Sequence, residues 1–212
     1  PEHVAALVAR TPEAMPRGIS SASEFAPMLA AADVVVVGPG LGQSPWSIEL
    51  LQLVLASGKP LVLDADGLNL LASGALGDFR RTDNWILTPH PGEAARLLSL
   101  TTAEVQDDRF AAVDALQARY GGVVILKGNG SLISDGECVL LSDYGNPGMA
   151  SGGMGDVLSG VIGALLAQHL PLVEAAALAV CLHGAAADSA AEEGQRGLLA
   201  SDLIPYMRAL LG

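Results

Sequence analysis

The chain alternates short, continuously apolar runs with longer segments in which apolar residues recur at helical spacing. The apolar runs cover residues 32–38, 60–63, 85–88 and 123–126. Their length, with glycine or polar residues at their ends, is typical of strands buried on both faces. The alternation of such strands with helices predicts an α/β fold, in which helices flank a mostly parallel sheet.

Residues with capping chemistry mark the ends of the helices. Ser44 can cap a helix that Gly58 ends. Thr101 and Glu104 form a capping-box pattern, and Ser201 can cap the last helix of the chain. The helices expected from these signals lie between residues 44 and 58, 101 and 120, 172 and 193, and 201 and 211.

A β-hairpin is expected near residue 135. Asp135 and Gly136 separate two short runs, residues 132–134 and 137–141. An Asp-Gly pair favours the positive φ angles of a tight hairpin turn. The sheet is therefore expected to carry an antiparallel hairpin at one edge.

The segment that begins at Gly155 is expected to form a buried helix. Its apolar residues recur at helical spacing up to Leu166. Gly160, Gly163 and Ala164 are small enough to let a neighbouring element approach this helix closely.

Composition and charge narrow the function classes. The chain has 212 residues, suits one domain, and carries a formal net charge of −12. This charge repels polyanions, so no nucleic acid partner is expected. A phosphorylated ligand would need backbone N–H groups, a helix N-terminus or a metal ion.

The cysteine pattern and the apolar segments bear on the compartment. Cys138 and Cys181 form no C-x-x-C pair, which favours a reduced, cytoplasmic setting without a zinc or redox motif. Residues 172–191 are the most apolar helical segment, but polar and charged residues interrupt them. No membrane-spanning helix is therefore expected.

The glycine-rich segment 151–156 is the strongest candidate for chemistry. Its glycines lie directly before the expected helix, where successive N–H groups and the helix dipole favour a bound anion. Asp156 lies in the first turn and could act as a general base beside a phosphate. The position equally suits a carboxylate that only caps the helix, and both interpretations remain open.

Other polar residues follow the strands. The glycines at 38–42 end in Gln43, where a dinucleotide fingerprint requires glycine, and Walker A is absent. Lys127 could meet a phosphate or remain a solvated strand-end lysine. His90, between two prolines, could bind substrate or be only an exposed loop histidine.

Two more sets of residues have a functional and a structural interpretation. Asp64, Asp66 and Asn69 could hold Mg²⁺ through water, although turn and capping roles explain them nearly as well. His183 lies inside an expected helix, where a packed structural histidine is the favoured interpretation. The metal ligands are not assigned by the sequence.

Taken together, these motifs resemble the ADP-dependent NAD(P)H-hydrate dehydratase family. The resemblance rests on residues 38–42, 64–66, 88–93, 127–128 and 146–160, in this order along nearly the whole chain. It implies a ribokinase-like fold and an enzyme, a hydro-lyase, that repairs the S epimer of hydrated NADH or NADPH. ADP would phosphorylate the hydrate, and loss of phosphate would return NAD(P)H with AMP.

The resemblance also implies site residues and partners. Asp156 would be the catalytic base, and Mg²⁺ would accompany ADP. A cytoplasmic homo-oligomer with a fused or partner epimerase domain is expected. The implied substrate-binding residues are Gly40, Gly42, His90 and Asp156, and the implied nucleotide-binding residues are Lys127, Gly128, Asn129, Gly130, Ser131, Gly153 and Gly155.

Two departures from the family pattern limit the resemblance. The family carries further strands and a substrate loop upstream of Pro1, so residues 1–212 are expected to be one N-terminally incomplete domain, less stable and less active than an extended version. Ser131 stands where threonine is usual. The alternatives are a ribokinase-like small-molecule kinase and a nucleotide-binding module without turnover.

Overall fold

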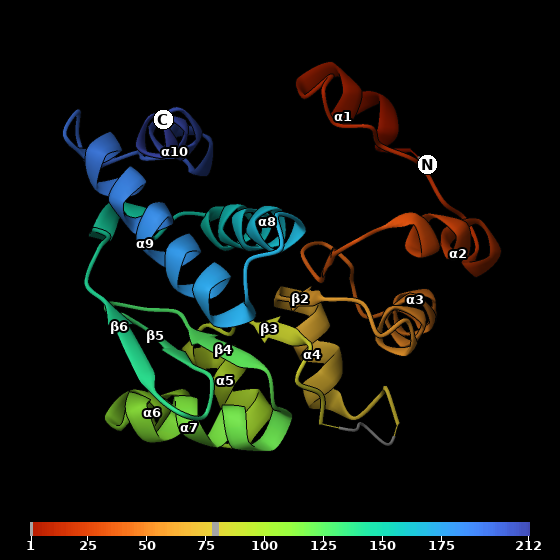
Figure 1. Ribbon diagram of the computed structural model, residues 1–212, viewed down its shortest axis with the longest axis horizontal. Coiled ribbons are helices and arrows are strands. Elements are labelled where there is room, and N and C mark those ends of the chain that lie inside the picture. The colour runs from red at the N-terminus through yellow and green to blue at the C-terminus, as the bar shows by residue number, and fades with distance from the viewer. Residues whose placement is uncertain (1, 78–80) are drawn as a thin grey trace.

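A computed structural model describes residues 2–77 and 81–212. Pro1, which the expectation of missing upstream sequence concerns, lies outside the described residues. A six-stranded sheet in the order β1-β2-β3-β4-β5-β6 forms its centre (Figure 1). The strands β1 to β4 are parallel, and β5 and β6 continue the sheet in antiparallel orientation. The predicted α/β fold with an antiparallel hairpin at one edge is confirmed. The strands are β1 (Val35–Val37), β2 (Leu61–Leu63), β3 (Trp85–Leu87), β4 (Val123–Leu126), β5 (Ser131–Ser134) and β6 (Val139–Ser142).

Helices cover both faces of the sheet (Figure 1). On one face, Val62 and Ile86 pack with apolar residues of α8 (Met154–Ala167) and α9 (Leu172–Ala191). On the other, Leu63 and Leu87 pack with α3, α4, α5 and α7. The parallel strands β2, β3 and β4 are therefore apolar throughout because neither of their faces meets water. The other helices are α1 (Val4–Arg10), α2 (Ala22–Ala31), α3 (Pro45–Ala56), α4 (Ala65–Ser73), α5 (Pro91–Leu98), α6 (Thr102–Asp107), α7 (Arg109–Tyr120) and α10 (Leu203–Leu211), with 3₁₀ turns Pro147–Met149 and Ala200–Asp202.

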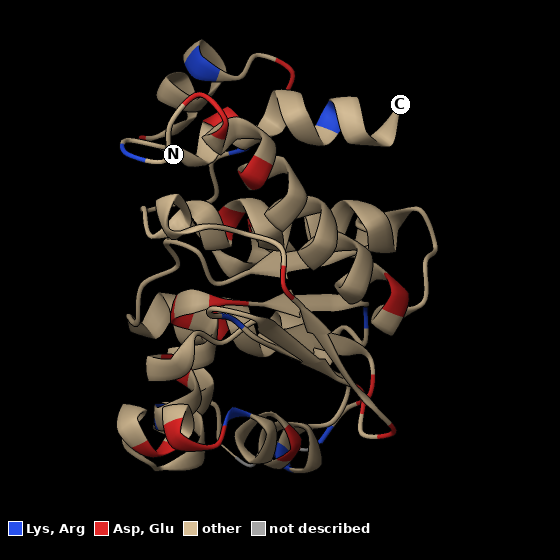
Figure 2. Cartoon of the chain, turned by 90° about the vertical axis from the view of Figure 1, so that its left-hand side faces the viewer, with Lys and Arg blue, Asp and Glu red and all other residues tan. Residues whose placement is uncertain are grey.

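The charged residues lie outside the sheet. Asp and Glu lie on the helices and loops, whereas the strands contain no charged residue (Figure 2). Polar side chains gather at the ends of the strands, and the candidate site lies there.

The first strand differs from its prediction. A buried strand was expected over residues 32–38, but β1 covers only Val35–Val37 and forms an edge of the sheet. Val36 is 40% exposed because only β2 pairs with this strand. An unbroken apolar run therefore does not distinguish an edge strand from a central one.

Two helix boundaries also differ. The helix expected from residue 101 to 120 is interrupted at Asp108, which has φ −139° and whose side chain accepts a hydrogen bond from Ala111 N–H. Ser201 does not cap the last helix, because it lies in the 3₁₀ turn before α10. The prediction for α3 is confirmed: Ser44 Oγ accepts from Ser47 N–H.

The hairpin and the glycine helix are confirmed in outline and corrected in detail. Asp135 Oδ1 accepts from the N–H groups of Glu137 and Cys138, so the turn is longer than an Asp-Gly pair and β6 begins only at Val139. In α8, a methyl group on Gly163 would lie 2.4 Å from Val36 Cγ2, which confirms a close approach.

Gly160 and Ala164 do not contribute to that approach. A methyl group on Gly160 would meet no atom within 4 Å, and Ala164 is exposed. Both residues lie on the outer side of α8, where a small side chain brings no neighbour closer.

The long helix α9 passes through the layer above the sheet. By length and composition alone, Leu172–Ala191 is the one helix among the described residues that could cross a bilayer. Half of that apolar window is buried inside the fold, where α9 packs on α8, α10 and the sheet. A buried core helix accounts for its composition.

Candidate active site

The polar residues singled out by the sequence meet at the carboxyl edge of the parallel strands. Asp64 follows β2, His90 follows β3 and Lys127 follows β4. The amino end of α8 lies against them, since a methyl group on Gly155 would be 3.2 Å from Lys127 Nζ and 3.6 Å from Asp64 Oδ2. Residues far apart in sequence thus form one site, where open α/β sheets bind ligands.

Two carboxylates hold the lysine of this site. Lys127 Nζ donates to Asp64 Oδ1 at 2.8 Å and lies 3.9 Å from Glu93 Oε2. Asp64 is almost fully buried and also accepts a hydrogen bond from Ser159 Oγ at 2.8 Å. Burial alone would raise the pKa of Asp64, but the Lys127 charge and these hydrogen bonds outweigh it and hold that pKa below its usual range.

His90 is fixed at the amino end of α5. Its Nδ1 accepts hydrogen bonds from the N–H groups of Gly92 and Glu93, and its own backbone N–H donates to Glu93 Oε2. Because Nδ1 accepts, the proton of the neutral ring is on Nε2. Nε2 lies 3.5 Å from Glu93 Oε1, and the side chain is 51% exposed, so the ring is held by Glu93 on one side and open to a ligand on the other.

The predicted nucleotide loop, residues 127–131, joins β4 to β5. Arg109 donates to the carbonyl oxygens of Asn129 at 2.6 Å and Leu126 at 3.2 Å. Gly128 has φ +152°, and a methyl group there would lie 2.9 Å from Arg109 Nη2. Glycine is favoured at this position because of its positive φ angle, whereas the tip of Arg109 could move aside for a methyl group.

The amino end of α8 bears on the two interpretations of Asp156. The N-cap of the helix is Gly153, with φ +88°, and no side chain caps this end. Asp156 lies in the first turn and is exposed. The capping interpretation is therefore not realised, and the carboxylate is available to a ligand.

The loop after β1 lies against the start of α4. A methyl group on Gly38 would lie 1.8 Å from the Asp64 carbonyl oxygen, so only glycine fits there. Gly42 N–H donates to Asp66 Oδ2 at 2.8 Å. Gly40, with φ +64°, has open space above its Cα. The loop thus presents bare backbone at the edge of the site.

His183 is a packed histidine, as the sequence favoured. It lies in α9, only 6% exposed, and burial lowers its pKa to about 4, although a hydrogen bond to the Met154 backbone works in the opposite direction. Two buried polar atoms near the amino end of α8, His183 Nε2 and Ser151 Oγ, have no hydrogen-bond partner among the described residues.

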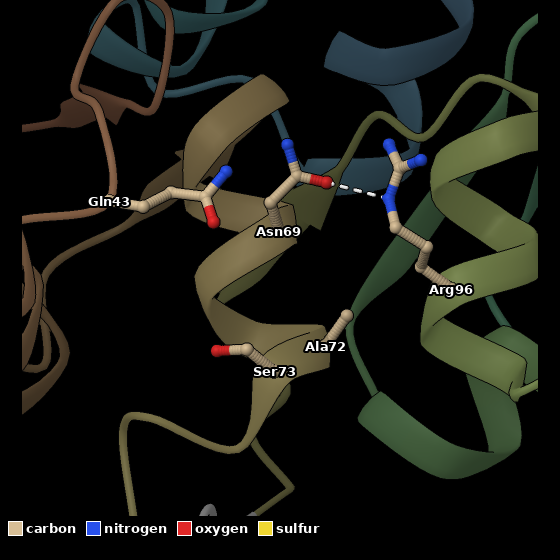
Figure 3. A pocket seen from close by; sticks show the side chains of 5 residues that line it. All are labelled: Gln43, Asn69, Ala72, Ser73 and Arg96. Atoms are coloured by element: carbon tan, nitrogen blue, oxygen red, sulfur yellow. Dashed lines mark hydrogen bonds between the residues drawn. The ribbon is translucent and has the colours of Figure 1, made fainter.

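Two cavities adjoin this edge. One, of about 510 Å³, lies beside Ser151 and is bordered by the 3₁₀ turn at Pro147–Met149 and by residues 195–199. The other, of about 570 Å³, lies beyond Gly42 and is lined by Gln43, Asn69, Ala72, Ser73 and Arg96 (Figure 3).

The structure also brings in residues that the sequence did not single out for a role. Glu93 and Ser159 contact the lysine–aspartate pair, and Arg109 supports the nucleotide loop. Of the three residues suggested for Mg²⁺, Asp64 binds Lys127, Asp66 binds Gly42 and Asn69 accepts from Arg96. No cluster of three or more His, Cys, Asp or Glu residues suited to a metal ion occurs in residues 2–77 and 81–212.

Comparison with known proteins gives consistent relatives. The family model for NAD(P)H-hydrate dehydratase matches residues 1–208. The bifunctional NAD(P)H-hydrate repair enzyme Nnr of Coxiella burnetii is 53% identical over 213 residues, which cover the whole of this chain and 43% of that protein. The ADP-dependent (S)-NAD(P)H-hydrate dehydratase of Neisseria meningitidis is 46% identical, over 82% of this chain and 62% of that one.

Solved structures agree on the fold. A ribokinase-like superfamily protein from Enterococcus faecalis has a TM-score of 0.86 and 31% identity, over 98% of this chain and 74% of that one. The ADP/ATP-dependent NAD(P)H-hydrate dehydratase of Bacillus subtilis, co-crystallised with ATP and Mg²⁺ and soaked with coenzyme A, has a TM-score of 0.83 and 29% identity, over 99% of this chain and 77% of that one. The ribokinase-like fold is thereby confirmed, and the chain, which spans less than half of the Coxiella protein, belongs to the NAD(P)H-hydrate dehydratase family.

Proposed function

We propose that this chain catalyses the ADP-dependent dehydration of the S epimer of hydrated NADH or NADPH. The observation that carries the proposal is the meeting of Lys127, the loop that follows it and the uncapped amino end of α8 at one edge of the sheet. This arrangement supplies a cation, backbone N–H groups and a free carboxylate. Phosphoryl transfer depends on such charge stabilisation and positioning more than it depends on a covalent intermediate.

Each residue would contribute a separate step. Asp156 would take the proton of the hydrate hydroxyl while the hydroxyl oxygen attacks the β-phosphorus of ADP. The bond from that phosphorus to AMP breaks, and AMP is released. Loss of phosphate, together with a proton from the adjacent ring carbon, then restores the double bond of the dihydronicotinamide ring. Lys127 and the N–H groups at Gly153 and Gly155 would stabilise charge on the transferring group. His90 Nε2 and the bare backbone at Gly40 and Gly42 would position the hydrate.

Mg²⁺ is proposed as a companion of the nucleotide. Asp64 and Glu93 both lie against Lys127 Nζ, so these carboxylates already face a cation, and Mg²⁺ would be held mainly by the nucleotide phosphates. A Mg²⁺ ion shared with phosphates needs only one or two protein carboxylates. When bound, it would neutralise part of the phosphate charge next to a chain of net charge −12.

The broader setting of the enzyme remains a prediction. We propose that residues 1–212 belong to one dehydratase domain whose sheet accepts further sequence at the free outer edge of β1; the exposure of Val36 there supports this. A fused or partner epimerase domain is proposed from the bifunctional relatives. Homo-oligomerisation and a cytoplasmic location stay predictions, the latter supported by the two free cysteines.

Incubation of the chain with hydrated NADPH, ADP and Mg²⁺ tests the proposal. We expect the near-ultraviolet absorbance of the dihydronicotinamide ring to return, with AMP and phosphate formed in equal amounts. A ribokinase-like kinase would instead accumulate a phosphorylated product without that absorbance. Binding of ADP without any turnover would indicate a nucleotide-binding module, and either result would overturn the dehydratase assignment.

A further inference from the structure

The cavity beyond Gly42 lies between three segments of the chain. Gln43 comes from the loop after β1, Asn69 and Ser73 come from α4, and Arg96 comes from α5 (Figure 3). Its volume of about 570 Å³ lies within the usual range of small-molecule sites. Apart from Ala72, its lining side chains carry amide, hydroxyl or guanidinium groups, so it suits a polar ligand.

Three segments that line this cavity also lead to the candidate active site. Gly42, which precedes the lining residue Gln43, is held by Asp66, and Asn69 lies about one helical turn further along α4. On α5, Arg96 likewise lies about one turn beyond Glu93, which contacts His90. A ligand that contacts Gly42 and His90 can therefore extend down between α4 and α5 into the cavity.

Arg96 supplies the positive charge of the cavity. Its Nε donates to Asn69 Oδ1 at 2.8 Å, which fixes the plane of the guanidinium group. Its two terminal nitrogens have no hydrogen-bond partner among the described residues, and Figure 3 shows them at the far side of the group from α5. An arginine with one edge fixed and the other free is suited to a phosphate oxygen pair.

We propose that this cavity holds the phosphate-bearing, non-reacting half of the hydrated dinucleotide, with Arg96 as its phosphate contact. The inference rests on the proposed function, because it assumes that the hydrated ring lies at Gly40, Gly42 and Asp156. The rest of such a substrate carries a pyrophosphate and, in NADPH, a 2′-phosphate. In a chain of net charge −12, these groups need a local cation, and Arg96 provides it.

Kinetics with both hydrated cofactors test the role of Arg96. In Arg96→Gln we expect KM for the hydrate to rise about tenfold or more, because a charge-assisted contact is lost, while kcat and KM for ADP stay unchanged. Arg96→Lys should recover only part of the affinity, because lysine lacks the planar fork. A rise with hydrated NADPH alone assigns the contact to the 2′-phosphate, and an equal rise with hydrated NADH assigns it to the pyrophosphate.

Controls separate this inference from the proposed function. Arg208→Gln, which removes an exposed arginine of α10 away from the cavity, should leave all constants unchanged. Calorimetric titration with hydrated NADPH in the absence of ADP measures binding without turnover. Weaker binding by Arg96→Gln than by the unaltered chain supports the inference even if the chain proves inactive as a dehydratase. Equal KM and equal affinity, or no binding by the unaltered chain, would overturn it.

Discussion

At the scale of single residues, Asp156 shows how one observation bears on a choice between two roles. A carboxylate in a first helical turn suits a cap and a base equally well. Gly153 occupies the N-cap and no side chain caps the helix, so Asp156 makes no capping hydrogen bond, and its structural contribution is that of a negative charge near the helix dipole. Its exposure next to the Gly155–Lys127 contact favours chemistry.

Asp156→Asn tests this role. We expect kcat to fall by about 10²- to 10⁴-fold, the usual loss on removing a general base, with the affinity for ADP unchanged. Turnover and calorimetric titration with ADP measure the two effects. Glu174→Gln is a matched control, because Glu174 lies in the first turn of α9. Residual turnover close to that of the unaltered chain would place the base elsewhere.

Residue types at strand ends predicted where the site lies, but not how its members pair. The sequence indicated that Asp64, His90 and Lys127 end neighbouring parallel strands, and such ends meet at one edge. It left Lys127 between a phosphate contact and a solvated side chain, and Asp64 between a metal ligand and a helix cap. The structure shows Asp64 capping α4 and joined to Lys127 by a 2.8 Å contact. Pairing across β3 depends on strand order, which no local pattern specifies.

At the scale of elements, α8 contains two glycines with opposite environments. Gly163 lies against Val36, where an added methyl group would be 2.4 Å from Cγ2, whereas Gly160 faces open space. Both lie inside the helix, so both carry the backbone entropy of glycine. Only at Gly160 can alanine remove that cost without a clash.

The two alanine variants should therefore change stability in opposite directions. We expect Gly160→Ala to raise the free energy of unfolding by about 0.5–1 kcal/mol and Gly163→Ala to lower it by about 1–3 kcal/mol. Urea unfolding of each variant beside the unaltered chain measures both. Equal shifts of the same sign would contradict the packing of α8 on β1.

Element boundaries were predicted less well than element types, for a common reason. Asp108 and Asp135 each accept backbone N–H groups, which ends one element and starts the next. Such local hydrogen bonds compete with helix and strand pairing at short-chain carboxylates. Helix α2 was not predicted, although Ser21 and Glu24 carry the residue types of a capping box. Its interior Pro27 obscured the helical pattern.

At the scale of the whole molecule, the buried His183 links stability to pH. Its pKa of about 4 in the folded chain lies below its ordinary value of 6.5, because burial disfavours the charged ring. Between these two values the unfolded chain binds a proton that the folded chain does not. The stability contribution of the neutral ring is therefore complete above pH 6.5 and is lost as pH falls toward 4.

His183→Asn should remove this dependence, because asparagine does not titrate and can still donate to the Met154 backbone. Between pH 7 and pH 4.5 we expect the unaltered chain to lose about 2–3 kcal/mol more of its free energy of unfolding than this variant loses. Urea unfolding at the two pH values gives the comparison. His169→Asn is the control, because His169 is exposed and asparagine tolerates its φ of +66°. The free energy of unfolding could instead depend on pH equally in the unaltered chain, His183→Asn and His169→Asn. Since α9 carries His183 and packs on α8, that result would mean that water reaches the His183 ring at the amino end of α8.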